Sequence, residues 1–250
     1  MKRVGIFTAT RWEQVAVSRA ILIEERARIG GVPCAIGRRG ACWVSVFRTG
    51  MGPVKASEAS REVFASCSLD LAVSSGYACA LTPSQVGDLL IGTDVCFGSA
   101  GTGSVVPNET LPCSKAVQAV ALESGRRVGM TVQAGRFVSV GRVLWLADEK
   151  RHAAAGTGAT GLDMESAAIG VAAKERQVPF VIARTVSDLL DEDLPLDFNL
   201  FLAAKTWPQG LWQGASRPSC LAGILRLRRQ SQAAASQLTR FMGEFLNALR

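Results

Sequence analysis

Short blocks of apolar residues separated by polar turns run along most of this chain. Apolar runs bounded by turn residues predict strands, and apolar positions three and four apart predict helices. The predicted strands cover residues 3–9, 33–36, 42–48, 71–81, 88–95, 129–140 and 180–183. The predicted helices cover residues 12–27, 54–65, 114–124, 146–151 and 164–175, and a loop rich in glycine and serine is expected at 97–112. Because strands and helices alternate without a visible repeat or linker, we expect one α/β domain with a mainly parallel or mixed sheet.

The end of the chain has a different pattern. Residues 196–202 predict a short helix, and residues 207–218 an irregular loop that contains glycine and proline. Residues 221–249 are strongly helical, with apolar positions at helical spacing at Leu221, Ile224, Leu225, Leu238, Phe241, Met242, Phe245 and Leu249. Such a stripe normally packs on a core, which is the interpretation we favour. Arg226, Arg228 and Arg229 beside it leave open a peripheral helix that touches a membrane.

Composition indicates a folded protein with an unevenly distributed charge. Hydrophobic residues make up 48% of the 250 residues and charged residues 20%, which argues against disorder. From Phe201 onward there are seven basic residues and one acidic residue, so this segment carries most of the net charge of +7. The basic segment lacks interleaved aromatic residues beyond Trp207 and Trp212, and we therefore expect no nucleic-acid partner.

Cysteine usage and the start of the chain indicate a cytoplasmic protein. The seven cysteines are scattered, with no CxxC or Cys/His pairing, which is typical of a reducing compartment and predicts no zinc site. The first apolar run is short and ends at Arg11 and Glu13, so it predicts a first strand and not a signal peptide. No stretch reaches the length of about 20 apolar residues that a membrane-spanning helix needs.

Several familiar chemistries lack their residues. His152 is the single histidine, and it follows Lys150 and Arg151 in a helix that we expect to be exposed, which disfavours Ser-His-Asp or Cys-His catalysis. No GxGxxG follows the first strand, and no GxxxxGK[ST] occurs, so dinucleotide and nucleotide triphosphate binding lack their motifs. Carboxylate chemistry remains. Paired acids suit a reaction that protonates a leaving group and passes through a cationic, oxocarbenium-like sugar.

Candidate acids stand at predicted sheet edges. Glu165 lies at the start of a helix and Asp188 just after the following strand, with Arg184 four residues before Asp188. Both positions meet at the edge outside the carboxyl ends of the strands, where open α/β sheets usually bind ligands. Their positions also fit two purely structural roles. Glu165 could be a carboxylate that is stabilised by the dipole at the start of a helix, and Asp188 could be a helix N-cap. From spacing alone, the structural roles are the simpler explanation. Glu13 follows the first strand and is a third candidate.

A glycine turn precedes the predicted helix at 54–65. Gly50-Met51-Gly52-Pro53 follows a strand and places proline at the first helical position. The N–H groups of such a turn could hold an anion or a ribose hydroxyl, or the turn could serve chain reversal alone.

A family resemblance rests on these elements in their order along the chain. The most specific part is a Met-Glu helix start followed, at the right spacing, by an Arg-x-x-Ser-Asp strand end. The residues that carry it are Glu13, Gly50-Met51-Gly52-Pro53, Gly76, Gly87-Asp88, Gly135-Arg136-Phe137, Asp163-Met164-Glu165 and Arg184-Thr185-Val186-Ser187-Asp188. Over about residues 1–205 the chain resembles the nucleoside phosphorylase/nucleosidase superfamily. It is most similar to methylthioadenosine/S-adenosylhomocysteine nucleosidases and the related hopanoid-biosynthesis nucleosidases.

The resemblance implies a fold and a domain organisation. It implies a single three-layer α/β/α domain with a central mixed, partly barrel-like sheet and a C-terminal amphipathic helix. Residues 1–205 would form the phosphorylase-like domain, and residues 206–250 a loop and a helix packed on the same domain. Relatives are usually homo-oligomers, often dimers that complete each other's pockets, and no metal or organic cofactor is implied.

The resemblance also implies roles for individual residues. Asp188 would be the general acid that protonates N7 of a purine, and Glu165 would accept hydrogen bonds from the ribose hydroxyls. Glu13 would hold or deprotonate the attacking water, with Arg184 nearby. The substrate would also meet Met164 at the ribose, Phe137 stacked on the base, the Val138 backbone at the base edge, and the turns that contain Gly52, Gly76 and Tyr77.

These roles imply a purine nucleosidase that acts on an adenosine-type compound, with a hopanoid-linked adenosine as one option. Two alternatives stay open. A phosphate-dependent nucleoside phosphorylase would carry an arginine in the turn at 75–80, where none is present, and Arg11 and Arg48 are the only basic residues near plausible anion positions. A non-catalytic nucleoside-binding protein is the other, because Tyr77, Cys79 and Ala80 stand where the family turn has serine and two glycines.

Overall fold

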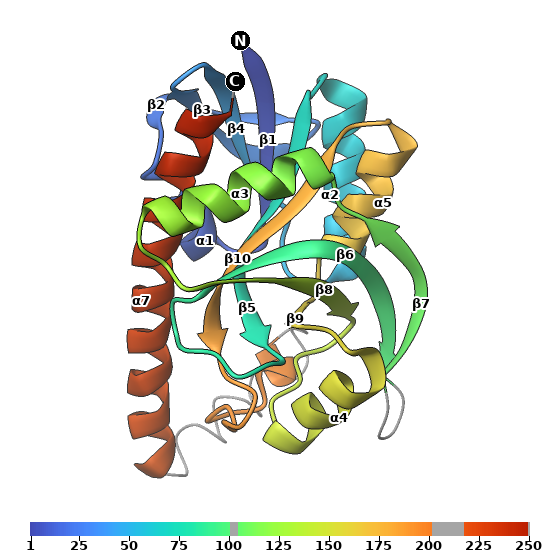
Figure 1. The fold of residues 1–250 in the computed structure, drawn as a ribbon, viewed down its shortest axis with the longest axis vertical. Helices are drawn as coiled ribbons and strands as arrows, with labels where there is room; N and C mark the ends of the chain where they lie inside the picture. The colour runs from blue at the N-terminus through green and yellow to red at the C-terminus, as the bar shows by residue number, and fades with distance from the viewer. Residues whose placement is uncertain (101–104, 202–217, 250) are drawn as a thin grey trace.

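A sheet of ten strands lies between two groups of helices in the computed structural model, which describes residues 1–100, 105–201 and 218–249 (Figure 1). The first half contains β1 (Lys2–Thr8), α1 (Arg11–Ser18), β2 (Leu22–Ile29), β3 (Val32–Arg39), β4 (Cys42–Arg48), α2 (Pro53–Ser66), β5 (Leu71–Ala80), β6 (Leu89–Ala100) and β7 (Val105–Pro112). The second half contains α3 (Lys115–Arg127), β8 (Val132–Val140), α4 (Ala147–Thr157), β9 (Gly161–Asp163), α5 (Ser166–Glu175), β10 (Phe180–Asp188), the 3-10 helix η1 (Phe198–Phe201) and α7 (Pro218–Ala248).

The sheet is mixed and closes partly into a barrel. Strand β5 pairs in parallel with β10, which pairs with β6, and β6 continues through β8 and β9 back to β5. Strands β1, β4, β3 and β2 extend the sheet away from this ring. The expected mixed, partly barrel-like α/β fold is therefore confirmed.

Strand β5 belongs both to the ring and to its extension, and one stretch of its edge is left without a neighbouring strand. Its first half pairs with β1 as far as Ser74, and its end pairs with β9 from Cys79 onward. Between these two positions the same edge of β5 has no strand beside it among the described residues. Backbone groups in this interval are therefore available to side chains from α1 and β10.

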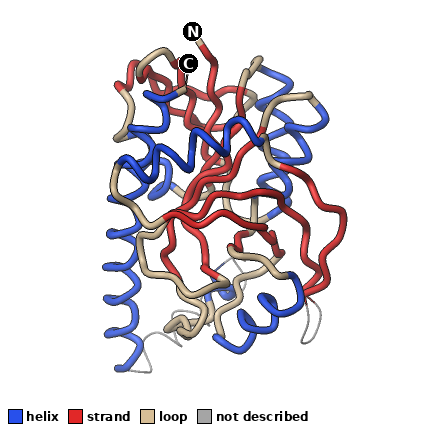
Figure 2. Tube along the Cα trace, viewed as in Figure 1, coloured by secondary structure: helices blue, strands red, loops and turns tan. Residues whose placement is uncertain are grey.

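Two hydrophobic clusters make the three layers. One face of the sheet packs with α2 and α5, and the other with α1, α3 and α7. Figure 2 shows the strands running through the middle, with helices along both sides. Helix α5 approaches the sheet closely because its buried positions are small, and a Cβ at Gly170 would lie 3.1 Å from a ring carbon of Phe180.

Two expectations about secondary structure were wrong. Residues 22–27 were expected to continue the first helix, but they form β2, an edge strand paired with β3. The segment is rich in Glu, Arg and Ala, which favour helices, and the hairpin at Gly30 and Gly31 overrides this preference by pairing it with β3. The expected loop at 97–112 is instead largely the β6–β7 hairpin, in which Pro107 lies next to a register shift, where a missing N–H is tolerated.

The second half of α7 is a core element. Its residues Leu238, Phe241, Met242, Phe245 and Leu246, together with Leu249 just after the helix, are buried against the sheet face that also holds α1 and α3. Core packing is thus confirmed for this half. In the first half, by contrast, Ile224 and Leu225 are 36% and 56% exposed. The loop expected at 207–218 lies almost wholly outside the described residues, which contain no helix long and apolar enough to cross a membrane.

Candidate active site

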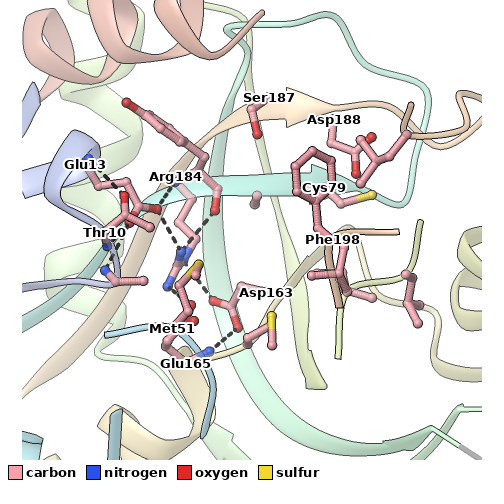
Figure 3. A pocket seen from close by; sticks show the side chains of 18 of the residues that line it. Thr10, Glu13, Met51, Cys79, Asp163, Glu165, Arg184, Ser187, Asp188 and Phe198 are labelled. Atoms are coloured by element: carbon pink, nitrogen blue, oxygen red, sulfur yellow. Dashed lines mark hydrogen bonds and ion pairs between the residues drawn. The ribbon is translucent and has the colours of Figure 1, made fainter. Parts of the chain in front are cut away.

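A cavity of about 310 Å³ opens where β5 and β10 end, next to the starts of α1 and α5. Six of the predicted site residues line it, namely Glu13, Tyr77, Met164, Glu165, Arg184 and Asp188. They come from four segments of the sequence, and Figure 3 shows Glu13, Glu165 and Arg184 on one side of the cavity and Asp188 on the other. The remaining lining is mostly apolar and includes Leu144, Leu194, Phe198 and Leu227.

Arg184 on β10 occupies the centre of the polar side of this cavity and is 1% exposed. Its guanidinium uses the open edge of β5: Nη1 donates to the Tyr77 carbonyl at 3.0 Å and Nη2 to the Ser74 hydroxyl at 3.0 Å. These two contacts hold the planar guanidinium in one orientation. Arg184 is thus fixed before any ligand arrives.

Three carboxylates surround this single guanidinium. Asp163 lies 2.8 Å from Nε, Glu165 lies 3.5 Å from Nη2, and Glu13 lies 3.9 Å from Nη1. All three acids are buried, with exposed fractions of 4% to 5%. Buried carboxylates that outnumber their cation create a site that favours positive charge.

Glu13 is positioned by the first turn of α1. Thr10 is the N-cap, and Thr10 and Glu13 form a capping box in which each side chain bonds the other's backbone N–H. The Oε2 atom of Glu13 also accepts from the Ala9 N–H at 3.0 Å, whereas Oε1 accepts from the Tyr77 N–H at 2.9 Å. Oε1 therefore keeps a lone pair that can meet a ligand.

Gly76 permits this contact between Glu13 and β5. A Cβ at Gly76 would lie 2.2 Å from Oε1 of Glu13 and 3.2 Å from Nη1 of Arg184, and the backbone there has φ +150°. A larger residue would force the carboxylate away from the strand. The neighbouring Tyr77 does not prevent the approach, because its backbone N–H and carbonyl make the contacts while its ring packs against the cluster that contains α1 and α7.

Glu165 is the N-cap residue of α5 and reaches back to the glycine turn before α2. Its Oε1 accepts from the Gly52 N–H at 2.9 Å. Burial raises the pKa of Glu165 to about 7, with the charges of Asp163 and Glu13 adding to the increase and Arg184 opposing it. Near neutral pH this carboxyl can therefore exist with or without its proton, according to the charge of a neighbouring ligand.

Asp163 is a site residue to which the sequence reasoning assigned no role. Its Oδ1 accepts from the Ser139 hydroxyl at 2.5 Å and from the N–H groups of Glu165 and Ser166 at 3.2 Å, which caps α5. Its Oδ2 accepts from the Ser166 hydroxyl and pairs with Arg184. An aspartate three residues before the first turn of a helix signals such a cap, but its pairing with a distant arginine has no sequence signal.

Asp188 ends β10 on the other side of the cavity and pairs with Lys150 of α4. Lys150 Nζ lies 2.7 Å from Oδ1 of Asp188. Burial raises the pKa of the Asp188 carboxyl above its ordinary value, whereas Lys150 and the Cys79 thiol oppose the increase. The expectation that the helix of Lys150 is exposed holds for His152 but is wrong for Lys150, which is completely buried. The two residues are two positions apart on α4, so they point to nearly opposite faces of the helix.

Four predicted residues do not line the cavity. Phe137 and Val138 on β8 are fully buried, and Phe137 packs under Gly161, where a Cβ would lie 2.6 Å from its ring. Gly52 and Gly76 lie behind the acids, where they contact Glu165 and Glu13. The two glycines thus shape the site through its carboxylates, and the structure does not bring Phe137 and Val138 to the cavity.

The charged side chains around the cavity are paired with one another. Both arginines that line it are paired, Arg184 with the three acids and Arg142 with Glu149 at 2.7 Å. Among the described residues, no group of three or more His, Cys, Asp or Glu side chains is arranged to hold a metal ion.

Comparisons with known proteins identify the family and the fold of the chain. The model of the phosphorylase superfamily matches residues 3–206. The 5′-methylthioadenosine/S-adenosylhomocysteine nucleosidase of Neisseria meningitidis, solved with methylthio-immucillin-A, is similar over 100% of both chains, at 18% identity and a TM-score of 0.78. Futalosine hydrolase of Helicobacter pylori is similar over 99% of this chain and 98% of its own, at 16% identity and a TM-score of 0.78. The S-adenosylhomocysteine nucleosidase of Streptococcus pyogenes matches over 100% and 98%, at 14% identity and a TM-score of 0.78. At these identities the likeness is one of fold.

Proposed function

The chain belongs to the phosphorylase superfamily, and we propose that it is a purine nucleosidase that hydrolyses the N-ribosidic bond of an adenosine-type nucleoside. The observation that carries the proposal is the placement of the acids around one cavity. Asp188 lies on one side, and Glu13 and Glu165 lie with Arg184 on the other (Figure 3). A nucleoside between them would present its base to Asp188 and its sugar to the two glutamates.

Asp188 is the proposed general acid. Its raised pKa supports this role, because an acid must carry its proton when the substrate is bound. As the bond between C1′ and N9 breaks, its electron pair moves into the purine, and the Asp188 proton passes to N7. The base then leaves as a neutral molecule, and Asp188 remains as a carboxylate.

Glu13 and Glu165 serve the sugar and the water. The sugar becomes positively charged in the transition state, and the excess of buried carboxylates around Arg184 stabilises that charge. Glu165 accepts hydrogen bonds from the ribose hydroxyls. Glu13 holds a water through the free lone pair of Oε1 and takes a proton from it as the oxygen attacks C1′. The products are the free base and the free sugar.

The same charges support hydrolysis over phosphorolysis. A phosphate ion would have to bind beside three carboxylates that already share one guanidinium. The other arginine of the cavity, Arg142, is paired with Glu149. Water carries no charge and meets no such repulsion.

The deciding experiment is an assay for release of the free purine base, which is adenine for the adenosine compounds and hypoxanthine for futalosine. Methylthioadenosine, S-adenosylhomocysteine, adenosine and futalosine are each incubated with the protein, with and without phosphate. We expect release that does not depend on phosphate and that yields a reducing sugar. Release that requires phosphate and yields ribose 1-phosphate would assign the protein to the phosphorylases. Calorimetric binding of adenine without turnover of any substrate would instead indicate a nucleoside-binding protein.

A second candidate substrate is a lipid-linked adenosine, such as the hopanoid-linked adenosine of the resembling branch. Much of the cavity lining is apolar, and one lining residue, Leu227, belongs to the half of α7 that exposes Ile224 and Leu225. Arg228 and Arg229 on that half are also exposed and could meet anionic headgroups. We expect binding to anionic vesicles at low salt that Leu225→Asp abolishes. No binding at low salt would remove the support for this substrate.

A homodimer is the proposed assembly. Met51 lines the cavity and is 45% exposed. Trp12, which precedes the lining residue Glu13, is 78% exposed, and Val54, three residues after Met51, is 68% exposed. Large exposed apolar residues of this kind favour a protein–protein interface, here with a second copy of the chain. Light scattering should give the mass of a dimer for the wild type and of a monomer for Trp12→Glu. A monomeric wild type would exclude the dimer.

A further inference from the structure

Lys150 is an unusual residue for a surface helix because it is completely buried. Its Nζ lies 2.7 Å from Oδ1 of Asp188, 3.1 Å from the Leu189 carbonyl and 2.6 Å from the Glu192 carbonyl. An ammonium group has three N–H donors, and here each has one acceptor. The full set of contacts therefore fits the charged form of the lysine.

Hydrogen bonds between the start of α4 and the segment after β10 fix the position of the helix that carries Lys150. Helix α4 begins against the segment after β10, where the Ala147 N–H donates to Oδ1 of Asp193 at 2.7 Å. The Leu194 N–H donates to the Trp145 carbonyl at 2.8 Å. The two backbones are thus joined independently of Lys150. These bonds hold α4 to the segment after β10 without Lys150. The ammonium group of Lys150 pairs with Asp188.

Few other charged or titratable groups act on Asp188. The Cys79 thiol from β5 is one, and burial raises its pKa well above the ordinary value, so it stays neutral. Glu192 in the segment after β10 is the other, and its negative charge opposes ionisation of Asp188. Among the described residues, Lys150 is the cation in contact with Asp188.

We propose that Lys150 is a positioning residue for Asp188, which orients the carboxyl group and stabilises the carboxylate that forms when the proton passes to the leaving base. This inference rests on the proposed nucleosidase function. Before the transfer, the ammonium faces a neutral carboxylic acid. After it, the bond between C1′ and N9 is broken, the proton is on N7 of the purine, and the ammonium faces a carboxylate. The attraction is therefore stronger in the transition state than in the bound substrate, which is the condition for accelerating the reaction.

The test compares Lys150→Met with Arg151→Met as the matched control. Arg151 follows Lys150 on α4 and also reaches the segment after β10, pairing with Asp191 at 2.8 Å, but it is exposed. We expect Lys150→Met to lower kcat for the nucleoside by about 10² to 10³ with little change in KM, as for loss of one stabilising donor. Arg151→Met should leave both constants unchanged.

The pH profile gives a readout that a structural role would not move. Lys150 lowers the pKa of Asp188, so its removal raises that pKa. Activity is lost as pH rises through the pKa of a general acid, because the proton is then gone. The basic limb of the profile should therefore move to higher pH in Lys150→Met and stay in place in Arg151→Met.

A riboside whose leaving group needs no proton distinguishes a loss of acid catalysis from a general loss of folded enzyme. With 4-nitrophenyl β-riboside, Lys150→Met should keep most of the wild-type rate. Equal losses on both substrates, or an unmoved basic limb, would overturn the role of Lys150 while leaving the nucleosidase intact. A wild type that cleaves neither compound would instead overturn the proposed function, and this inference with it.

Discussion

Buried charge is organised differently on the two sides of the cavity. Around Arg184, one guanidinium faces Glu13, Asp163 and Glu165, whereas at the end of β10 one ammonium faces Asp188 alone. The first arrangement has unpaired negative charge and favours a cationic ligand. The second is balanced when Asp188 is ionised, so the ammonium stabilises the carboxylate that remains once the proton has been transferred. The proposed cleavage needs both environments at the same moment, the first for the sugar and the second for the leaving base.

The largest effect is expected from Asp188→Asn, which removes the proton donor and keeps the shape of the side chain. We expect kcat for nucleosides to fall by about 10² to 10⁴, the usual contribution of general acid catalysis. Steady-state assays of adenine release measure this. The control is Asp191→Asn, since the Asp191 side chain is 73% exposed and does not reach the cavity. A variant as active as the wild type would place the proton donor elsewhere.

Arg184→Met tests the excess of negative charge directly. Methionine cannot neutralise the surrounding acids, and leaving buried charges without their partner typically costs about 3–5 kcal/mol of the free energy of unfolding. Urea unfolding at neutral pH measures this loss. Arg61→Met, which breaks the exposed pair with Glu175, should leave the midpoint unchanged. If Arg184→Met and Arg61→Met have the same urea midpoint, the three acids around Arg184 do not carry an excess of negative charge.

Gly76→Ala tests the close approach of β5 to the Arg184 side. Its Cβ would lie 2.2 Å from Oε1 of Glu13, so the carboxylate or the strand must shift. Overpacking of this kind costs about 1–3 kcal/mol, and the displaced Glu13 should also lower kcat. Thermal unfolding and turnover measure the two effects. Gly141→Ala has open space around its Cβ and should change neither.

The smallest effect concerns the proton on Glu165. Its pKa of about 7 in the folded protein exceeds the ordinary value of 4.5, so the folded state binds the proton more tightly. The stabilising contribution of this proton is complete below pH 4.5 and is lost as pH rises toward 7. Glu165→Gln removes this dependence, and the stability of the variant relative to the wild type should therefore increase between pH 5 and pH 7.5. Urea midpoints across this range measure the difference.

A flat difference between Glu165→Gln and wild type would contradict the raised pKa. Glu175→Gln at the exposed end of the same helix is the matched control, and it should follow the wild type at every pH. Together with Arg184→Met, this variant distinguishes whether the acids share a proton or all carry charge.

Local patterns predicted much of the fold. Strand β4 was predicted with its observed bounds, and α2 and α5 were placed within two residues of their observed bounds. In each of these segments the residue pattern and the turn residues at its ends agree. Strand β2 was mispredicted because its composition favours a helix and only pairing with β3 decides otherwise. Strand β7 contains two prolines and no clear alternation, so nothing local identifies it.

The sequence by itself determined which acids to consider, because Glu13, Glu165 and Asp188 stand beside recognisable turns and element ends. Only the tertiary structure decided what each acid meets. Ring closure through β5 and β10 brings Arg184 among three carboxylates, and the docking of α4 turns Lys150 inward to Asp188. The physical reason is that the charge state of a buried acid depends on neighbours a few ångströms away, and those neighbours lie far apart along the chain.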